Sequence, residues 1–276
     1  MENDKEKELI EKTGKNPITH SGISADLEKL GVEPGMFLLV HSSMSSLGWV
    51  CGGAAAVIQA LEDTVRPYGL IVMPAHSGDL SDPSGWNNPP VPESWYDSIR
   101  ETMPAYNPDI TPTRGIGVVA ELFRTFPYVM RSMHPQVSFA AWGEKALDIV
   151  SDHELDFSMG NSSPLGKLYE ENAYILHIGT QWDTNTAFHL AEYRYYGEVS
   201  NTAYTWAPVE IHGHRRWKRF IDTDYDSSDF LNLGEDYEKK MEHEIKTGKI
   251  GLAQSRLFPM QSCVDFAVNW FKRHRQ

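Results

Sequence analysis

Cysteine is scarce in this chain, and no stretch is both long and apolar enough to cross a membrane. Cys51 and Cys263 are the two cysteines among 276 residues, too few and too far apart for a disulfide framework or a zinc site. No uninterrupted apolar run approaches the roughly 20 residues that span a bilayer. The first residues are charged and mixed in sign, unlike a signal peptide. These features predict a cytoplasmic protein that binds no membrane and no metal.

Basic residues are fewer than acidic residues in this chain. Lysine and arginine number 25 against 38 acidic residues, so the formal net charge is −13. A phosphate backbone needs a basic footprint on its partner, so no nucleic-acid partner is expected. A cationic small molecule is attracted to such a surface, although acidity also serves solubility alone. Hydrophobic residues make up 41% of the chain and charged residues 23%, an ordinary globular balance.

Two apolar runs enclose a helical pattern in the first third of the chain. Residues 36–41 and 69–74 are continuous apolar segments of strand length, typical of strands buried on both faces. Between them, residues 53–66 repeat apolar side chains at helical spacing. A strand, a helix and a strand with short connections predict a βαβ unit with parallel pairing. Residues 173–179 supply a third buried strand.

The regular pattern breaks between residues 76 and 113, which are rich in proline, serine, asparagine and tryptophan. So long an irregular segment inside a compact domain is usually functional. Three elements are predicted near the C-terminus: a hairpin of residues 205–211 and 216–222, a charged helix over 230–246, and a last helix over 259–273. The last helix carries Trp270 and Phe271, which pack inward or against a second subunit. Since no repeat or linker interrupts it, the chain is expected to form one α/β domain over residues 1–276.

An imidazole and a carboxylate stand three residues apart just after the third strand. His189 and Glu192 leave the same face of the segment, about one turn apart, if it is helical. A carboxylate that accepts the proton of one ring nitrogen fixes the histidine tautomer and raises the basicity of the other nitrogen. An imidazole oriented by a carboxylate is the minimum that a histidine general base requires. By spacing alone, however, most such pairs are solvated surface neighbours.

Three further segments are rich in serine, threonine, glycine or histidine. Residues 41–48 follow the first strand, where ligands collect in open α/β sheets, although they also suit a helix N-cap. Residues 111–117 combine threonines, an arginine and two glycines, which suit a phosphate but match neither a P-loop nor a dinucleotide fingerprint. Residues 131–143 hold a His-Pro pair with a serine four residues after the histidine; a turn histidine is the plainer interpretation.

Together these segments resemble the aminoglycoside N3-acetyltransferase family, the acetyl-CoA-dependent antibiotic N-acetyltransferases. Six pieces stand in the family's order and cover most of residues 17–200: VHSSMSSLG (40–48), SDPSGWNNPPVPESW (81–95), MPAYNPDITPTRGIGVVAELFR (103–124), RSMHPQVSFAAWG (131–143), SPLGKLYEENAYILHIG (163–179) and TAFHLAEYR (186–194). The resemblance implies a three-layer α/β/α sandwich around a largely parallel or mixed sheet, with an additional C-terminal hairpin and helix region. It also implies acetyl transfer from acetyl-CoA to an amine, an antibiotic-resistance activity.

The resemblance assigns His189 as the catalytic base and Glu192 as the residue that orients it. An alkylammonium must lose a proton before it attacks a thioester, and a neutral imidazole near pH 7 is the matched acceptor. Backbone N–H groups of residues 42–45 are expected to stabilise the charge that develops on the thioester carbonyl. The segments expected to line the coenzyme contain Ser42, Ser43, Thr113, Arg114, Gly115, His134 and Ser138.

The acceptor is expected to be a cationic aminoglycoside, acetylated at the 3-N position of 2-deoxystreptamine. Asp79, Asp82 and Glu121 are the carboxylates expected to hold its ammonium groups, with a solvated surface position as the alternative for each. A non-aminoglycoside amine is the main alternative acceptor, because residues 200–260 match no specific acceptor pattern. Direct transfer is expected; an acyl-enzyme on Cys51 is disfavoured because no activating neighbour accompanies that thiol.

Two other functions remain as alternatives. A homodimer is a possible assembly. A metal-dependent hydrolase would use His41, His76, Asp79 and His189, but these residues lack the tight spacing of a known ligand motif. A catalytically silent protein that only binds the coenzyme would have no need of the intact pair of His189 and Glu192.

Overall fold

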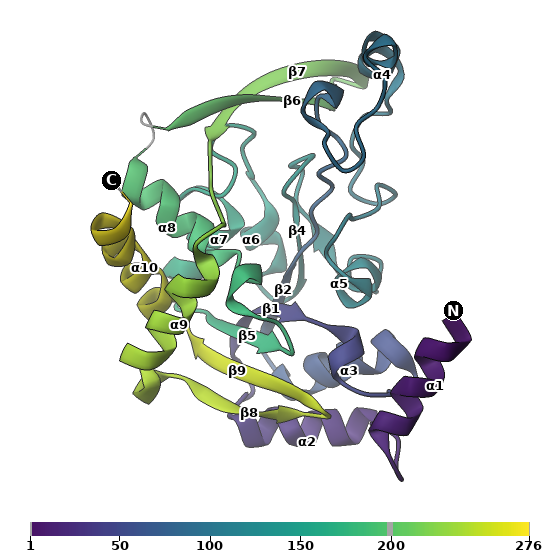
Figure 1. The fold of residues 1–276 in the computed structure, drawn as a ribbon, viewed down its shortest axis with the longest axis vertical. Helices are drawn as coiled ribbons and strands as arrows, with labels where there is room; N and C mark the ends of the chain where they lie inside the picture. The colour runs from purple at the N-terminus through teal and green to yellow at the C-terminus, as the bar shows by residue number, and fades with distance from the viewer. Residues whose placement is uncertain (1, 198–200, 276) are drawn as a thin grey trace.

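The computed structural model describes residues 2–197 and 201–275, and a mixed sheet lies at its centre (Figure 1). Within these residues, seven strands pair in the order β3-β4-β2-β1-β5-β9-β8. The strands are β1 (Phe37–Ser42), β2 (Leu70–Pro74), β3 (Met130–Arg131), β4 (Phe139–Gly143), β5 (Tyr174–Ile178), β8 (Lys246–Ile250) and β9 (Ala253–Pro259). β1 pairs in parallel with β2 and with β5, and the other pairs are antiparallel. The predicted parallel βαβ unit is confirmed.

Helices cover both faces of the sheet, so the predicted three-layer α/β/α sandwich is confirmed (Figure 1). One face carries α2 (His20–Leu30), α3 (Gly53–Val65) and α5 (Val118–Phe123). The other face carries α6 (Ala146–Val150), α7 (Pro164–Glu170), α8 (Ala187–Tyr196), α9 (Phe230–Lys240) and α10 (Met260–His274). A further helix, α1 (Glu2–Thr13), precedes α2. No helix in the described ranges is long and apolar enough to cross a membrane.

Side-chain alternation along β1 divides the core into two layers. Leu38 and Val40 pack with the helices of one face, and Leu39 between them packs with the helices of the other. All three are at most 2% exposed, as the continuous apolar run predicts for a strand buried on both sides. Each such side chain contributes about 1.5–3 kcal/mol by leaving water. The sheet is therefore a firm base for groups at its edge.

The C-terminal region agrees with the sequence predictions except over residues 241–259, where the charged helix ends early and two strands follow that the sequence does not predict. The hairpin is confirmed as β6 (Thr202–Ile211) and β7 (His214–Thr223), and the last helix as α10, with Trp270 and Phe271 buried inward. The charged helix, predicted to reach residue 246, ends at Lys240 as α9, and β8 and β9 follow. β8 forms the edge of the sheet and is polar. A search of the sequence for continuous apolar runs therefore does not detect it.

The long irregular segment is anchored to the hairpin. It contains three short helices: η2 (Pro83–Gly85), η3 (Glu93–Trp95) and α4 (Tyr96–Thr102). The Tyr106 N–H donates to the Pro208 carbonyl at 2.9 Å, and Arg215 Nε donates to the Met103 carbonyl at 2.5 Å. Figure 1 shows the hairpin reaching across to α4. The segment is thus held above the edge of the sheet where β1 and β2 end.

Candidate active site

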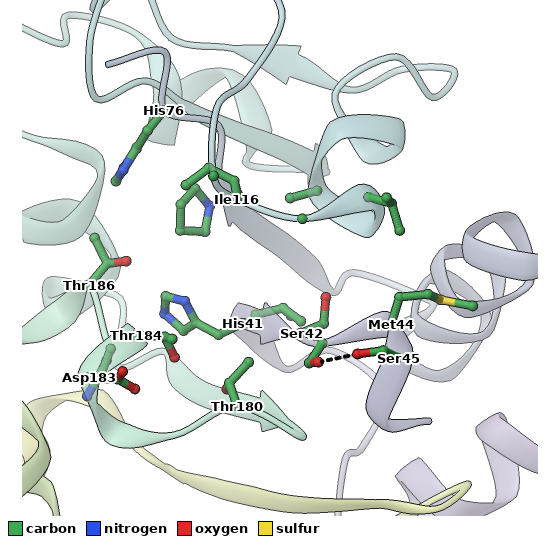
Figure 2. Close-up of a pocket in the computed structure, with 18 of the residues that line it drawn as sticks. His41, Ser42, Met44, Ser45, His76, Ile116, Thr180, Asp183, Thr184 and Thr186 are labelled. Carbon is green, nitrogen blue, oxygen red and sulfur yellow. Dashed lines mark hydrogen bonds between the residues drawn. The ribbon is translucent and has the colours of Figure 1, made fainter. Parts of the chain in front are cut away.

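The carboxyl ends of the parallel strands border a cavity of about 620 Å³ (Figure 2). β1 contributes His41 and Ser42, β2 contributes Pro74, and Thr180 follows β5. His189 of α8 also lines this cavity. Parallel strands bring their carboxyl ends to one edge, which is where open α/β sheets bind ligands. The cavity therefore lies where the fold predicts a ligand site.

Serine and glycine line two sides of this cavity. The turn after β1 forms η1 (Met44–Ser46), in which Ser46 Oγ donates to the Ser43 carbonyl at 2.6 Å. Gly115 and Gly117 precede α5 with φ of 73° and 89°, a backbone region that glycine adopts without strain. Because these residues carry small side chains or none, a ligand can approach the backbone closely.

His189 and Glu192 meet on α8, as their spacing predicts. His189 Nδ1 lies 2.6 Å from Glu192 Oε2, and the two side chains are 16% and 0% exposed. The other carboxylate oxygen, Oε1, accepts from the Asp226 N–H at 2.9 Å and from Arg275 Nη1 at 2.5 Å. An ionised carboxylate accepts hydrogen bonds only, so Nδ1 carries the ring proton and Nε2 is the basic nitrogen.

Aromatic rings fix the plane of this imidazole. The His189 ring lies 4.8 Å from the Tyr225 ring and 4.9 Å from the Phe230 ring, measured between centroids. Phe230 is 1% exposed and belongs to the core between α8, α9 and α10. The ring of His189 is thus restrained on two sides while part of the side chain borders the cavity.

Two more histidines border the cavity, and both of their rings turn toward it (Figure 2). Burial lowers the pKa of His41 to about 4. Burial, with added repulsion from His189 and His41, lowers the pKa of His76 to about 3. Both are neutral near pH 7. In the described protein, Nε2 of each ring and the Thr180 hydroxyl are buried and have no hydrogen-bond partner.

The positions of His41, His76, Asp79 and His189 do not support the alternative of a metal-dependent hydrolase. No cluster of three or more histidine, cysteine or acidic side chains within the described ranges is arranged to hold a metal ion. Asp79, which that alternative requires, pairs with Arg114 at 3.0 Å and borders a different cavity.

Neither cysteine borders the cavity around His189. Cys263 is fully buried in α10, where burial raises the pKa of its thiol and Asn185 Nδ2 donates to its sulfur at 3.4 Å. Cys51 is exposed between η1 and α3. An acyl-enzyme intermediate on either thiol is therefore not supported.

The residues predicted to line the coenzyme divide into two groups. Ser42, Ser43 and Gly115 border the cavity around His189. Thr113, Arg114, His134 and Ser138 do not. Thr113 donates through its hydroxyl and its N–H to Glu121, at 2.7 and 2.8 Å, and so shapes the turn that carries Gly115.

His134 and Ser138 are fully buried, which removes them from direct contact with any ligand in this conformation. His134 Nδ1 accepts from the Val137 N–H at 3.0 Å, and burial lowers the pKa of this ring well below its usual value. Ser138 Oγ donates to the Ala75 carbonyl at 2.7 Å and accepts from Arg131 Nε at 3.0 Å. Both therefore hold the turn between β3 and β4, the plainer interpretation for His134.

The three acids predicted to hold an amine are each paired with an arginine, and none borders the cavity around His189. The closest N–O distances in these pairs are 3.0 Å for Asp79–Arg114, 2.8 Å for Asp82–Arg100 and 2.5 Å for Glu121–Arg124. Burial raises the pKa of Glu121, but hydrogen bonds from Arg124 and Thr113 outweigh it and lower the value to about 2. In this structure the charge of each of these carboxylates is therefore compensated by its arginine.

The acid that does border the cavity is Asp183, which the sequence analysis missed. It belongs to η4 (Trp182–Thr184), between β5 and α8, and its side chain is exposed. The available signal was its place a few residues beyond the carboxyl end of a buried strand. The same rule had pointed to residues 41–48.

The family model for aminoglycoside 3-N-acetyltransferase matches residues 39–272. A curated relative from Bacillus subtilis (strain 168) is the SPbeta prophage-derived aminoglycoside N(3')-acetyltransferase-like protein YokD. It is 49% identical over 267 residues, which cover 96% of each chain. The crystal structure of the YokD protein superposes with a TM-score of 0.93 at 48% identity, over 97% of this chain and 98% of the other.

Two more distant solved structures contain bound molecules. AAC-IIIb, in a binary complex with CoASH, has a TM-score of 0.82 at 29% identity, over 94% of this chain and 97% of that one. AAC-VIa bound to sisomicin has a TM-score of 0.81 at 28% identity, over 95% of this chain and the whole of that one.

The pairing of Asp82 with Arg100 predicts how stability depends on pH. Hydrogen bonds from Arg100 and Ser84 lower the pKa of Asp82 from 3.8 to about 2. The carboxylate therefore stabilises the fold above about pH 4, and this contribution is lost as the pH falls toward 2. We expect Asp82→Asn to lower the free energy of unfolding at pH 7 by about 1 kcal/mol, measured by urea denaturation.

The difference between Asp82→Asn and the wild type should become much smaller as the pH falls from 4 to 2. Asp97→Asn is the matched control, because Asp97 lies 3.4 Å from the same guanidinium but is 92% exposed. A stability difference for Asp82→Asn that stays constant from pH 7 to pH 2 would contradict the ion pair.

Proposed function

This chain belongs to the aminoglycoside 3-N-acetyltransferase family, and from that membership we propose that it transfers the acetyl group of acetyl-CoA to an aminoglycoside amine. The acceptor position is the 3-N of 2-deoxystreptamine, and residues 1–276 act as one unit. The observation that carries the proposal is the buried pair of His189 and Glu192 at the edge of the cavity. Relatives that bind CoASH and sisomicin support both substrates.

In the proposed mechanism His189 Nε2 removes a proton from the acceptor ammonium. The neutral nitrogen then attacks the acetyl carbonyl carbon, so a C–N bond forms and negative charge develops on the carbonyl oxygen. As the C–S bond breaks, its electron pair goes to sulfur. The resulting thiolate takes a proton from the imidazolium, and the new amide nitrogen releases its second proton to water. Such a base contributes about 10²–10⁴ in rate. Glu192 holds the ring with Nε2 as the acceptor and stabilises the imidazolium.

The groups around the cavity fit a thioester substrate. The Ser43 N–H already donates to the Ile178 carbonyl at 2.9 Å, so the N–H groups of Met44 and Ser45 in the same turn are the proposed donors to a carbonyl oxygen. His41 and His76 are neutral near pH 7 because burial lowers their pKa values to about 4 and about 3. They therefore add no positive charge that would repel a cationic acceptor.

We assign the amine-binding role to Asp183 instead of the three acids predicted from the sequence. Among the described residues it is the acid that borders the cavity, and none of the ion pairs between those residues includes it. A carboxylate there lowers the cost of holding a desolvated ammonium group.

The chain is further proposed to be cytoplasmic, because Cys51 and Cys263 are both free thiols. The homodimer stays a prediction.

Acceptor identity is tested by release of CoA thiol from acetyl-CoA across a panel of amines. We expect turnover with gentamicin-like and kanamycin-like compounds and acetylation at the 3-amino group, identified by mass spectrometry and NMR. Simple diamines and amino sugars without 2-deoxystreptamine serve as controls. CoA binding without turnover of any aminoglycoside would contradict the proposed acceptor and favour a different amine.

Loss of the base should affect chemistry and not coenzyme binding. We expect His189→Ala to lower kcat by about 10²–10⁴, with the Kd for CoA measured by calorimetry changed less than about twofold. Glu192→Gln should slow turnover less, since it orients the base without replacing it. Full activity of His189→Ala would remove the proposed base, and an equal or greater loss in Glu192→Gln would mean that the carboxylate does more than orient.

Asp183→Asn should weaken binding of the amine specifically. We expect KM for the aminoglycoside to rise about fivefold at low salt, with KM for acetyl-CoA unchanged and the difference shrinking as ionic strength rises. The control is Glu154→Gln, at an exposed acid outside the cavity. An unchanged KM for the amine at low salt would show that Asp183 does not bind it.

A further inference from the structure

Arg275, which follows α10, reaches the carboxylate behind His189 from 83 residues farther along the chain. Its Nη1 donates to Glu192 Oε1 at 2.5 Å. Nε and Nη2 donate to the two carboxylate oxygens of Asp229 at 2.8 and 2.5 Å. The guanidinium also lies 3.9 Å from the centre of the Phe271 ring, and the side chain is 11% exposed. It is held on all these sides in one orientation.

The same guanidinium fixes the loop of residues 224–229. Arg275 Nη2 donates to the Asp226 carbonyl at 2.5 Å, and the Asp226 N–H donates to Glu192 Oε1 at 2.9 Å. Tyr225 in this loop contacts the His189 ring. One cation therefore connects the carboxylate that pairs with His189 and the loop that covers one side of its ring.

A buried carboxylate needs such a partner. Glu192 is 0% exposed, and a carboxylate buried without compensating charge is strongly destabilising. Burial lowers the pKa of Arg275, but hydrogen bonds to Asp229 and Glu192 outweigh it and raise the value above its usual range. The guanidinium is thus charged near neutral pH.

We propose that Arg275 is a positioning residue for acetyl transfer. It occupies one oxygen of Glu192 and so leaves the other oxygen to His189, while it holds loop 224–229 against the imidazole. This inference rests on the proposed function, because it concerns the same base. Arg275 itself contacts neither the ring of His189 nor the cavity around it in the described structure.

The charge of Arg275 has a predictable effect on the pH dependence. Among the described residues, the titratable groups around the pair of His189 and Glu192 are His76, Tyr225, Asp226, Asp229 and Arg275, with Asp183 on the wall of the same cavity. Arg275 is the permanent cation of this set, and a nearby cation opposes proton uptake by the pair. Its removal should make the pair easier to protonate. The acid limb of the kcat/KM profile should then move to higher pH, by about half to one unit.

The test compares Arg275→Gln and Arg275→Lys with the wild type. We expect Arg275→Gln to lower kcat about 10- to 100-fold, with both KM values changed less than about threefold and the acid limb shifted upward. Arg275→Lys keeps the charge but not the planar guanidinium that donates to Glu192 and Asp229 at once. The acid limb of its kcat/KM profile should therefore stay in place, and its kcat should fall about three- to tenfold. Arg273→Gln, at an exposed arginine of the same helix end, should match the wild type.

A second readout does not depend on activity. The imidazole of His189 is titrated by NMR, with its signal identified by its loss in His189→Gln, and its midpoint in Arg275→Gln should rise with the acid limb. If the wild type acetylates no amine, the proposed function fails while this titration still decides the role of Arg275. An unchanged kcat and an unchanged midpoint in Arg275→Gln would overturn the inference.

A purely structural role makes a different prediction. It would lower the melting temperature of both variants equally while leaving kcat and the midpoint of the folded enzyme unchanged, and that result would also overturn the inference. If Arg275→Gln does not fold, Arg275→Lys carries the test, and a wild-type kcat in that variant would contradict a positioning role.

Discussion

The contact between a fully buried carboxylate and an imidazole on one turn of α8 is the interaction on which the rest of the site depends. Burying Glu192 removes its solvation, so the charge persists only because His189, the Asp226 N–H and Arg275 all donate to it. These donors come from three separate parts of the chain. The helix α8, the loop before α9 and the end of α10 must therefore all be in place before the base is formed.

The cavity beside this contact has a simple electrostatic character. Burial keeps His41 and His76 neutral, and the acids on the surrounding loops are matched to arginines. Asp183 is left as the acid that borders the cavity in the described part of the chain. A neutral base beside one uncompensated carboxylate suits a cationic amine that must give up a proton, and it offers little to an anionic acceptor.

The fold was largely predictable because its central strands are continuous apolar runs and its helices repeat apolar residues at helical spacing. β8 was missed because an edge strand is polar, and an apolar criterion does not detect it. Within the site, the pair on α8 was accessible because its spacing is local. The arginine partners of the acids, and Arg275, depend on contacts between distant segments, so no local pattern reveals them. Asp183 lies a few residues beyond the carboxyl end of β5, so the strand-end rule that favours residues 41–48 also favours it.

The most direct test is a crystal structure of the protein with CoA bound. If His189 is the base, the CoA sulfur lies in the 620 Å³ cavity at the ends of β1 and β5, within about 3–4 Å of His189 Nε2. A thiol placed in the second cavity of about 530 Å³, beside Asp79 and Arg114, with His189 out of its reach, would contradict the assignment of the base.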